Sequence, residues 1–346
     1  MRIGTAKETY FADEALFDTR TQRVWLLVLA ALLAVFPFVA SQYWLYLACL
    51  VAINVIAATG LNILTGYTGL VSLGQAAFMG VGAYTVAVLE RRWGTPFLLN
   101  LLAGGAVAMV VGMVFGVPSL RVKGLYLAIA TIAASFILHF IFANWTAVTG
   151  GTAGLTVPPA NVFGLPLDSE FRSYWMIVPI AVLMVLGAAN LFRTRIGRAF
   201  IAIRDRDISA EVLGIPLLRY KLLSFGIASF YAGVAGGLWA YFFRSVTPES
   251  FPLIMSIFFL ACIIVGGMGT ILGSILGAAF MTLVPEALKL VFGWLPNAEA
   301  MAVHLAPVRT MVFGALIVGF LIFEPHGLAE MWRRVRRFFH LWPFRT

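Results

Sequence analysis

The hydrogen-bonding side chains of one apolar stretch, GYTGLVSLGQAAFMGVGAY at residues 66–84, are the best candidates for solute chemistry in this sequence. They are Tyr67, Thr68, Ser72 and Gln75, and they lie among five glycines. Irregular backbone at membrane depth persists only where it is buried in protein or lines an aqueous path. We therefore expect this stretch to border a translocation pathway, with Tyr126 and Thr131 from a later apolar run contributing to the same neutral lining.

Motifs for covalent, metal or nucleotide chemistry are absent from the sequence. There is no GxxxxGK[ST] phosphate loop, no HExxH and no GxSxG. The two cysteines, Cys49 and Cys262, lie in apolar runs without a CxxC partner and are expected to pack as small hydrophobic residues. We predict no catalytic residue, no metal site and no cofactor bound by this chain.

The composition indicates the setting of these residues. The chain has 346 residues, of which 61% are hydrophobic and 11% are charged. Soluble domains are nearer half apolar and a quarter charged. Uncharged runs of about 20 residues, the length that crosses a bilayer as a helix, recur along the sequence. The predicted fold class is an all-α polytopic integral membrane protein.

Ten spans are predicted from these runs. Their approximate limits are 24–40, 43–65, 68–89, 97–117, 124–143, 174–192, 222–243, 253–271, 273–292 and 305–323. With the N-terminus inside, 18 of the 24 Lys and Arg residues fall in four cytoplasmic segments, at 1–23, 118–123, 193–221 and 324–346. This bias follows the positive-inside rule and places both termini in the cytoplasm. Topology and anionic lipid, rather than nucleic acid, then account for the net charge of +9.

Small residues recur at helical spacing within the predicted spans. Such residues let helices approach closely in lipid, where hydrophobicity alone does not hold helices together. The expected packing residues are Gly69, Ser72, Ala76, Gly80 and Ala83 in the third span, Ser229, Gly233, Gly236 and Ala240 in the seventh, and Gly269, Gly273 and Gly277 around the turn near 270. These helices are predicted to pack tightly within the chain or against a partner.

Ionisable residues are nearly absent from the spans. Glu286 and Lys289, three residues apart near a helix end, are expected to pair or to reach the interface. Self-contained secondary transporters need a mid-membrane coupling residue, and channels need a filter, and the sequence shows neither. If this chain transports a solute, the energy is therefore expected to come from another subunit.

The segment 193–221 is the largest cytoplasmic loop and has helical character. Ile201, Ile208, Val212 and Ile215 fall on one face, and Arg204, Asp207 and Glu211 fall on another. Asp207 is placed to cap a helix over 208–213, which Gly214 and Pro216 end. Two settings suit such a helix: the lipid surface, or a groove in a protein partner. The mixed charge of its polar face favours the partner.

Several segments resemble one family in order and spacing. They are GLNILTGYTGLVSLGQAAFMGVGAY (60–84), GLYLAIATI (124–132), TGGTAGL (149–155), GRAFIAIRDRDISAEVLGI (197–215), LACIIVGGMGTILGSILGAAF (260–280), PEAL (285–288) and FEPHGL (323–328). This set resembles the LivM group of ABC-importer permeases for branched-chain amino acids. One departure is Ser274, where relatives often have proline, and residues 1–23 match no part of the family.

The resemblance implies a permease domain at 24–323 of the type II importer class, between a 1–23 tail and a basic 324–346 tail. Its implied partners are a sister permease (in a heterodimer or homodimer), two ABC ATPase subunits that carry ATP and Mg, and a periplasmic or lipid-anchored substrate-binding protein. The implied location is the bacterial inner membrane. Residues of the 193–221 loop that match the family's ATPase-coupling pattern are Gly197, Arg198, Ala202, Arg204, Asp205, Ala210 and Gly214. Glu211, on the polar helix face, is included with them, and Arg204 and Asp205 are expected to contact the ATPase.

The predicted topology adds an independent expectation. The second span runs inward and the seventh runs outward, so spans 2–5 and 7–10 are expected to form an inverted repeat with the pathway at its interface. The outer loop at 144–173 is the expected contact for the binding protein. Branched-chain amino acids are the first expected substrates, and urea, short amides and other small neutral solutes remain alternatives.

Overall fold

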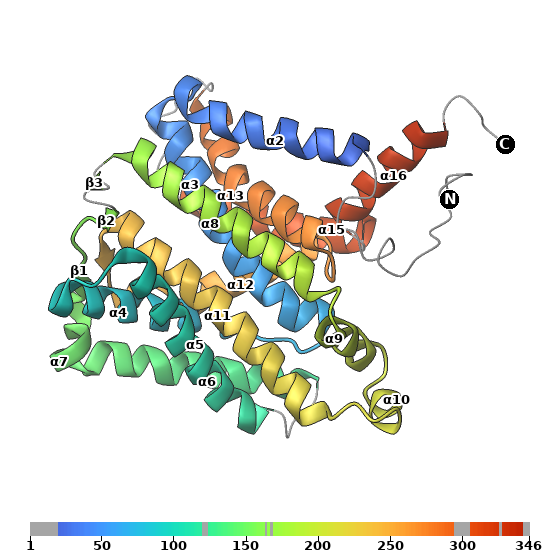
Figure 1. Cartoon of the computed structure of the whole chain (residues 1–346), viewed down its shortest axis with the longest axis horizontal. Coiled ribbons are helices and arrows are strands. Elements are labelled where there is room, and N and C mark those ends of the chain that lie inside the picture. The colour runs from blue at the N-terminus through green and yellow to red at the C-terminus, as the bar shows by residue number, and fades with distance from the viewer. Residues whose placement is uncertain are drawn as a thin grey trace.

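A computed structural model describes residues 20–119, 124–162, 165–166, 169–293, 305–324 and 327–341. Long helices make up most of it (Figure 1). In the first half they are α2 (Arg20–Val39), α3 (Gln42–Leu61) with its π-helical continuation η1 (Asn62–Tyr67), α4 (Gln75–Trp93), α5 (Phe97–Ser119), α6 (Leu125–Asn144) and α8 (Glu170–Leu191). They continue with α9 (Arg195–Asp205), α10 (Asp207–Val212), α11 (Leu217–Phe243), α12 (Leu253–Gly266), α13 (Ile271–Gly293), α15 (Leu305–Phe323) and α16 (Leu328–Leu341). The predicted tail at 1–23 lies outside the described residues up to residue 19.

Seven of the described helical segments are long and apolar enough to cross a membrane. They are Gln42–Tyr67, Phe97–Pro118, Tyr126–Asn144, Glu170–Leu191, Leu217–Phe243, Pro248–Gly266 and Ile271–Lys289. The predicted spans at 24–40, 68–89 and 305–323 coincide largely with α2, α4 and α15, which fall outside this set. An all-α polytopic architecture is therefore confirmed, and the count of ten and the inverted repeat stay predictions.

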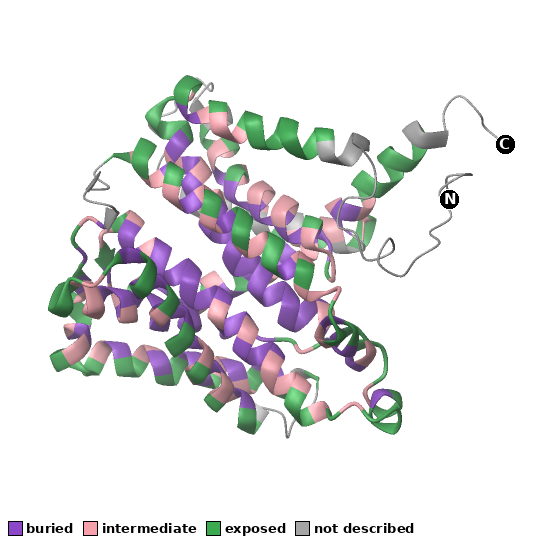
Figure 2. Ribbon diagram, viewed as in Figure 1, coloured by how far each residue is buried: buried purple, intermediate pink, exposed green. Residues whose placement is uncertain are grey.

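Close contact between glycines and backbone holds the centre of the bundle together. A Cβ added to Gly236 of α11 would lie 1.8 Å from the Met79 carbonyl oxygen of α4, and one on Gly82 would lie 2.2 Å from the Gly233 oxygen. The two helices therefore meet backbone to backbone, as small residues permit. Figure 2 shows the resulting buried core running through α3, α4 and α11.

The other predicted packing residues have similar surroundings. Ala76 is buried, and a Cβ on Gly80 would lie 2.8 Å from the Phe142 ring of α6. Between α12 and α13, a Cβ on Gly277 would lie 1.9 Å from the Cys262 oxygen. A Cβ on Gly273 would lie 2.4 Å from the Gly267 oxygen. Cys49 and Cys262 are both free and buried, as predicted.

Three of the predicted packing residues, Gly69, Ser72 and Gly269, lie outside helices. The predicted span 68–89 begins as a helix only at Gln75, and Gly69 has a φ of +76°. The predicted span 253–271 ends as a helix at Gly266, and Gly269 has a φ of +75°. A positive φ is incompatible with a right-handed helix, so the expected helical face through Gly69 and Ser72 does not exist.

The outer loop predicted at 144–173 contains the short helices α7 (Thr146–Thr149) and η2 (Gly151–Ala153) and three two-residue strands, β1 (Leu155–Thr156), β2 (Asn161–Val162) and β3 (Leu165–Pro166). β1 pairs antiparallel with β4 (Ser245–Val246), which follows α11 and precedes η3 (Pro248–Ser250). Strands β2 and β3 pair with each other. The loop is thus fastened to the second half of the chain, at the end of the bundle opposite α9 and α10 (Figure 1).

Two features near the chain's C-terminal side complete the fold. Lys289 and Glu286 form an ion pair with 2.7 Å between Nζ and Oε1, as their spacing predicted, and the Tyr43 hydroxyl donates to the same carboxylate. The segment predicted as a basic tail at 324–346 contains α16, which lies at the same end of the molecule as α9 and α10 (Figure 1).

Candidate functional site

The chain between η1 and α4, residues 68–74, forms a non-helical segment that we call the break. Its backbone groups are satisfied by side chains of other helices. Thr131 Oγ1 accepts from the Leu73 N–H at 2.9 Å, and Ser135 Oγ donates to the Leu73 oxygen at 3.2 Å. Both belong to α6. Buried backbone polar groups need such partners, so α6 compensates for the interruption of the helix.

The first turn of α4 is fixed in the same way. Ser256 Oγ of α12 accepts from the Ala76 N–H at 3.0 Å. Gln75 Nε2 donates to the Ala57 carbonyl of α3 at 2.8 Å. Helices from both halves of the sequence therefore meet at the start of α4.

Most of the predicted pathway residues gather around the break. Thr68, Ser72, Gln75 and Thr131 are all buried. Tyr67 ends η1 and stacks on Phe192, with ring centroids 3.4 Å apart. Tyr126 is different, because its side chain is 72% exposed and is not placed among these buried groups. The hydroxyls that we expected to meet solute thus satisfy local backbone in this conformation.

Asn62, the first residue of η1, joins η1, which precedes the break, to the turn between α12 and α13. Residues 267–270 form this turn, which we call the α12–α13 turn. Asn62 Nδ2 donates to the Thr270 oxygen at 2.8 Å and to Ser274 Oγ at 2.7 Å, and Asn62 Oδ1 accepts from the Gly269 N–H at 2.9 Å. Sequence reasoning missed this residue, although an amide inside an apolar span was the available signal. Short π-helical segments such as η1 are frequent at functional sites.

The loop at 193–221 forms two helices, as predicted. Thr194 caps α9, with Oγ1 accepting from the Gly197 N–H at 3.5 Å. Gly214 ends α10 with a φ of +84°, and the Ile215 N–H donates to the Ala210 oxygen at 3.0 Å. Closure of this kind is a common glycine-dependent helix end. Gly214 therefore ends α10 as predicted, whereas Asp207 is the first residue of this helix and not its cap, because the N-cap position is Arg206 and has no side-chain cap hydrogen bond.

Arg204, near the end of α9, lies across both turns described above. A Cβ on Gly69 would be 3.5 Å from Arg204 Cα, and a Cβ on Gly269 would be 2.3 Å from Arg204 Nη1. The same position on Gly269 is 3.0 Å from the Gly66 oxygen. Arg204 of the 193–221 loop therefore contacts both the break, in the first half of the chain, and the α12–α13 turn, in the second half. Gly69 and Gly269 leave the space that it occupies.

A polar cleft of about 200 Å³ opens beside this contact. Thr68 and Gly69 of the break and Gly124 before α6 line one part of it. The remainder is largely charged, with Arg204, Asp205, Arg206, Asp207 and Lys221. Lys221 Nζ lies 3.8 Å from the Asp207 carboxylate, which links α10 to α11. Opposite charges in the cleft suit polar contacts better than the binding of one highly charged ligand.

The outer surface of α10 carries exposed apolar side chains. Ile208, Val212 and Leu213 are 70%, 83% and 80% exposed. Among the predicted coupling residues, Gly197 and Ala210 are buried, Ala202 is half-buried, and Arg198, Arg204, Asp205, Glu211 and Gly214 are exposed. The loop therefore offers a mixed apolar and charged surface outward and Arg204 inward.

Comparison with known proteins identifies the family of this chain. Residues 43–321 match the family described as "Branched-chain amino acid transport system / permease component". The chain belongs to this family of permeases. It is a multi-pass membrane protein, and the resemblance inferred from the sequence motifs is confirmed.

Named relatives of this permease come from bacteria and archaea. It is 33% identical over 340 residues to the high-affinity branched-chain amino acid transport system permease protein LivM of Escherichia coli, covering 91% of this chain and 77% of the relative. A probable LivM of Methanocaldococcus jannaschii is 25% identical, covering 79% and 89%. The fructose import permease protein FruG of Bifidobacterium longum is 26% identical, covering 74% and 75%. No solved structure was found to match.

Proposed function

We propose that this permease is the membrane subunit of an ATP-driven importer, and that separate ATPase subunits dock on the loop at 193–221. The observation that carries the proposal is the position of Arg204, which joins that loop to the break and to the α12–α13 turn. A push on α9 would reach both halves of the chain through this one side chain. ATP and Mg would be held by the partner subunits.

The docking surface proposed on this loop is amphipathic. Ile208 and Val212 are one helical turn apart and are both exposed, so they can enter an apolar groove on the ATPase. Asp205 and Glu211 surround them with charge that fixes the register. Arg204 keeps its proposed ATPase contact and passes the movement inward.

The proposed assembly pairs this chain with a sister permease, identical or different, and with a periplasmic or lipid-anchored binding protein on the outer loop. Both termini then face the cytoplasm of a bacterial inner membrane. This orientation is supported by the basic residues of the 193–221 loop and of α16, which lie at one end of the bundle (Figure 1).

The proposed substrates are branched-chain amino acids or similar small neutral or zwitterionic solutes. The names of the LivM relatives support the amino acids. The buried polar side chains that the structure describes, all Asn, Gln, Ser or Thr, support a solute without large net charge. Urea and short amides remain alternatives, and the fructose relative supports a wider set of small uncharged solutes among similar permeases.

A double substitution tests the docking proposal. Arg204→Ala with Asp205→Ala is expected to abolish ATPase association and leucine uptake while leaving membrane insertion unchanged. Val212→Asp, which puts a charge on the apolar face, is expected to give the same result. Arg91→Ala removes an exposed charge in the last turn of α4, outside the proposed loop, and serves as the control. Full uptake by the double variant would reject the role given to this loop.

A second experiment separates the rival class. A self-contained secondary transporter would concentrate leucine in liposomes that hold only this chain. We expect no uphill uptake until the ATPases, the sister permease, the binding protein and ATP are supplied. Uptake by the chain alone would overturn the proposal.

A further inference from the structure

The C-terminal helix α16 has an exposed apolar face. Met331, Trp332 and Val335 are 44%, 56% and 48% exposed, and Phe338 is 53% exposed. Steps of three and four residues place these four side chains on one side of a helix. An exposed apolar face with a Trp is unusual in water and typical of a helix that contacts a partner or a lipid surface.

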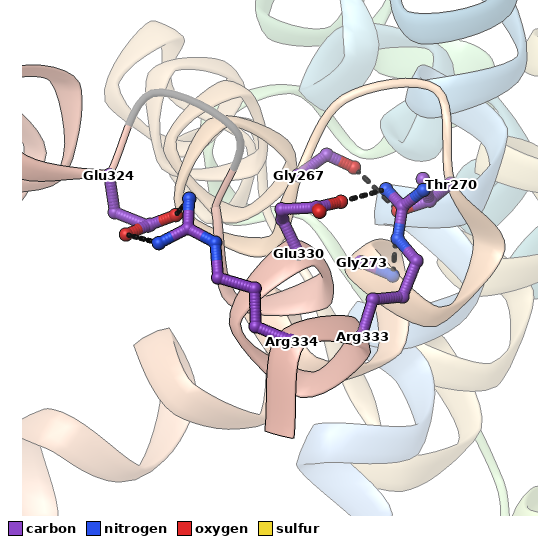
Figure 3. Close-up of polar contacts among 7 residues, drawn as sticks. All are labelled: Gly267, Thr270, Gly273, Glu324, Glu330, Arg333 and Arg334. Carbon is purple, nitrogen blue, oxygen red and sulfur yellow. Dashed lines mark hydrogen bonds and ion pairs between the residues drawn. The ribbon is translucent and has the colours of Figure 1, made fainter. Parts of the chain in front are cut away.

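The opposite side of α16 is strongly basic. It carries Arg333, Arg334, Arg336 and Arg337. Two of these form ion pairs, Arg333 with Glu330 at 2.9 Å and Arg334 with Glu324 at 2.7 Å (Figure 3). Arg336 and Arg337 are exposed, and among the residues that the structure describes neither has an ion pair.

The root of α16 is fixed close to the end of a predicted span. Four residues separate Phe323 of α15 from Leu328 of α16, which allows a reach of about 14 Å at most. A Cβ on Gly327 would lie 2.5 Å from the Gly267 nitrogen of the α12–α13 turn, and Ala329 is buried. Glu324, the residue after α15, forms an ion pair with Arg334 of α16 (Figure 3). The helix is therefore held at the bundle while its apolar face stays outward.

We propose that α16 binds acidic phospholipid at the membrane surface, with its apolar face in the lipid and Arg336 and Arg337 on lipid phosphates. Charge complementarity selects this occupant. A helix that docks on protein is expected to mix both signs, as α10 does with Asp207 and Glu211, whereas basic flanks around an apolar face favour anionic lipid. The short tether to α15 keeps α16 within reach of the bilayer and away from distant partners.

Lipid binding at α16 acts on the same turn that the coupling loop contacts. The α12–α13 turn touches Gly327 on one side and Arg204 on another. Thr270 Oγ1 holds the turn closed by donating to the Gly267 oxygen at 2.9 Å and accepting from the Gly273 N–H at 3.1 Å (Figure 3). Acidic lipid bound to α16 thus stabilises the turn that Arg204 contacts; its effect on transport rests on the proposed function of the 193–221 loop.

The test places a fluorophore on Val335→Cys in the full chain, in nanodiscs with acyl-chain quenchers and a rising fraction of phosphatidylglycerol. Cys49 and Cys262 are buried and leave the added thiol as the labelling site. Val212→Cys, at the same end of the bundle, is the matched control. We expect quenching at 335 to rise with phosphatidylglycerol and quenching at 212 to stay low at every composition.

Removing two charges tests the electrostatic part. Arg336→Gln with Arg337→Gln is expected to lower the ratio of bound to free α16 about 25-fold, at about fivefold for each arginine. Arg91→Gln with Arg92→Gln, the same charge change elsewhere, should leave the titration unchanged. An unquenched label at 335 overturns the proposal, as does quenching that ignores both lipid charge and the arginines. Protection of 335 that requires the ATPase or a second copy would identify a protein surface instead.

Discussion

Replacement of one glycine by alanine tests whether backbone contact holds this bundle together. Gly236 of α11 faces the Met79 carbonyl of α4, and an added Cβ would lie 1.8 Å from its oxygen and 2.7 Å from its carbon. Ordinary contact begins at 3.4 Å, so the approach is about 1.6 Å too close. The obstructing atoms are backbone, and they cannot rotate away. Gly236→Ala therefore forces α4 and α11 apart.

The expected loss of stability follows from two opposed terms. Overpacking of this severity costs about 3 kcal/mol. Alanine regains about 1 kcal/mol of helix propensity over glycine. The net loss is about 2 kcal/mol, which lowers the melting temperature by roughly 3 °C in a chain of this size.

The assay uses the two buried cysteines as reporters. Cys49 and Cys262 are the chain's two cysteines, so a thiol-reactive dye gains fluorescence as the protein unfolds. Gly314→Ala on α15 is the matched control, because a Cβ there meets nothing within 4 Å. Its melting temperature should stay the same or rise slightly. Equal melting of the Gly236 and Gly314 variants would show that α4 and α11 do not meet as described.

Four further substitutions follow from the contacts. Tyr241→Phe removes a 2.7 Å hydrogen bond to Glu90 and should cost about 2 kcal/mol, whereas Tyr84→Phe, whose hydroxyl has no partner in the described structure, should change stability by less than about 0.5 kcal/mol. The same melting assay checks both, and a destabilised Tyr84→Phe would contradict the absence of a bond. Asn62→Ala should cost about 3 kcal/mol and slow uptake in the assembled importer, since it leaves the α12–α13 turn unpaired; wild-type uptake would reject that link. Gly214→Ala forces a side chain into a φ of +84° and should cost about 1 kcal/mol, seen as faster proteolysis of the 193–221 loop; unchanged cleavage would argue against this helix end.

The features that sequence reasoning predicted correctly are those with local causes. The end of α10 depends on Gly214 and Pro216, which are two residues apart in the sequence. The Glu286–Lys289 pair depends on a three-residue spacing within one helix. Span positions depend on runs of apolar residues. In each case the decisive atoms belong to neighbouring residues, so the pattern and the structure carry the same information.

Irregular backbone was expected in this stretch, but the length of the break could not be predicted, because its causes are distant in the sequence. Gly69 and Ser72 continue the small-residue spacing of α4, and spacing alone indicates helix. The chain leaves that helix because Thr131 and Ser256, from α6 and α12, supply partners for its backbone. Asn62 was missed for the same reason, since its partners are more than 200 residues away.

The glycines at the contact of the 193–221 loop with the α12–α13 turn restrict how movement could pass through it. A Cβ added to Gly269 would lie 2.3 Å from Arg204 Nη1. A Cβ added to Gly327 would lie 2.5 Å from the Gly267 nitrogen of the same turn. Within the turn, Thr270 Oγ1 donates to the Gly267 oxygen and accepts from the Gly273 N–H. Its ends are fixed to α12 and α13, and Asn62 ties it to η1. Under the proposed coupling, a displacement of α9 is therefore expected to move η1 and the α12–α13 turn together, and not to open the break alone.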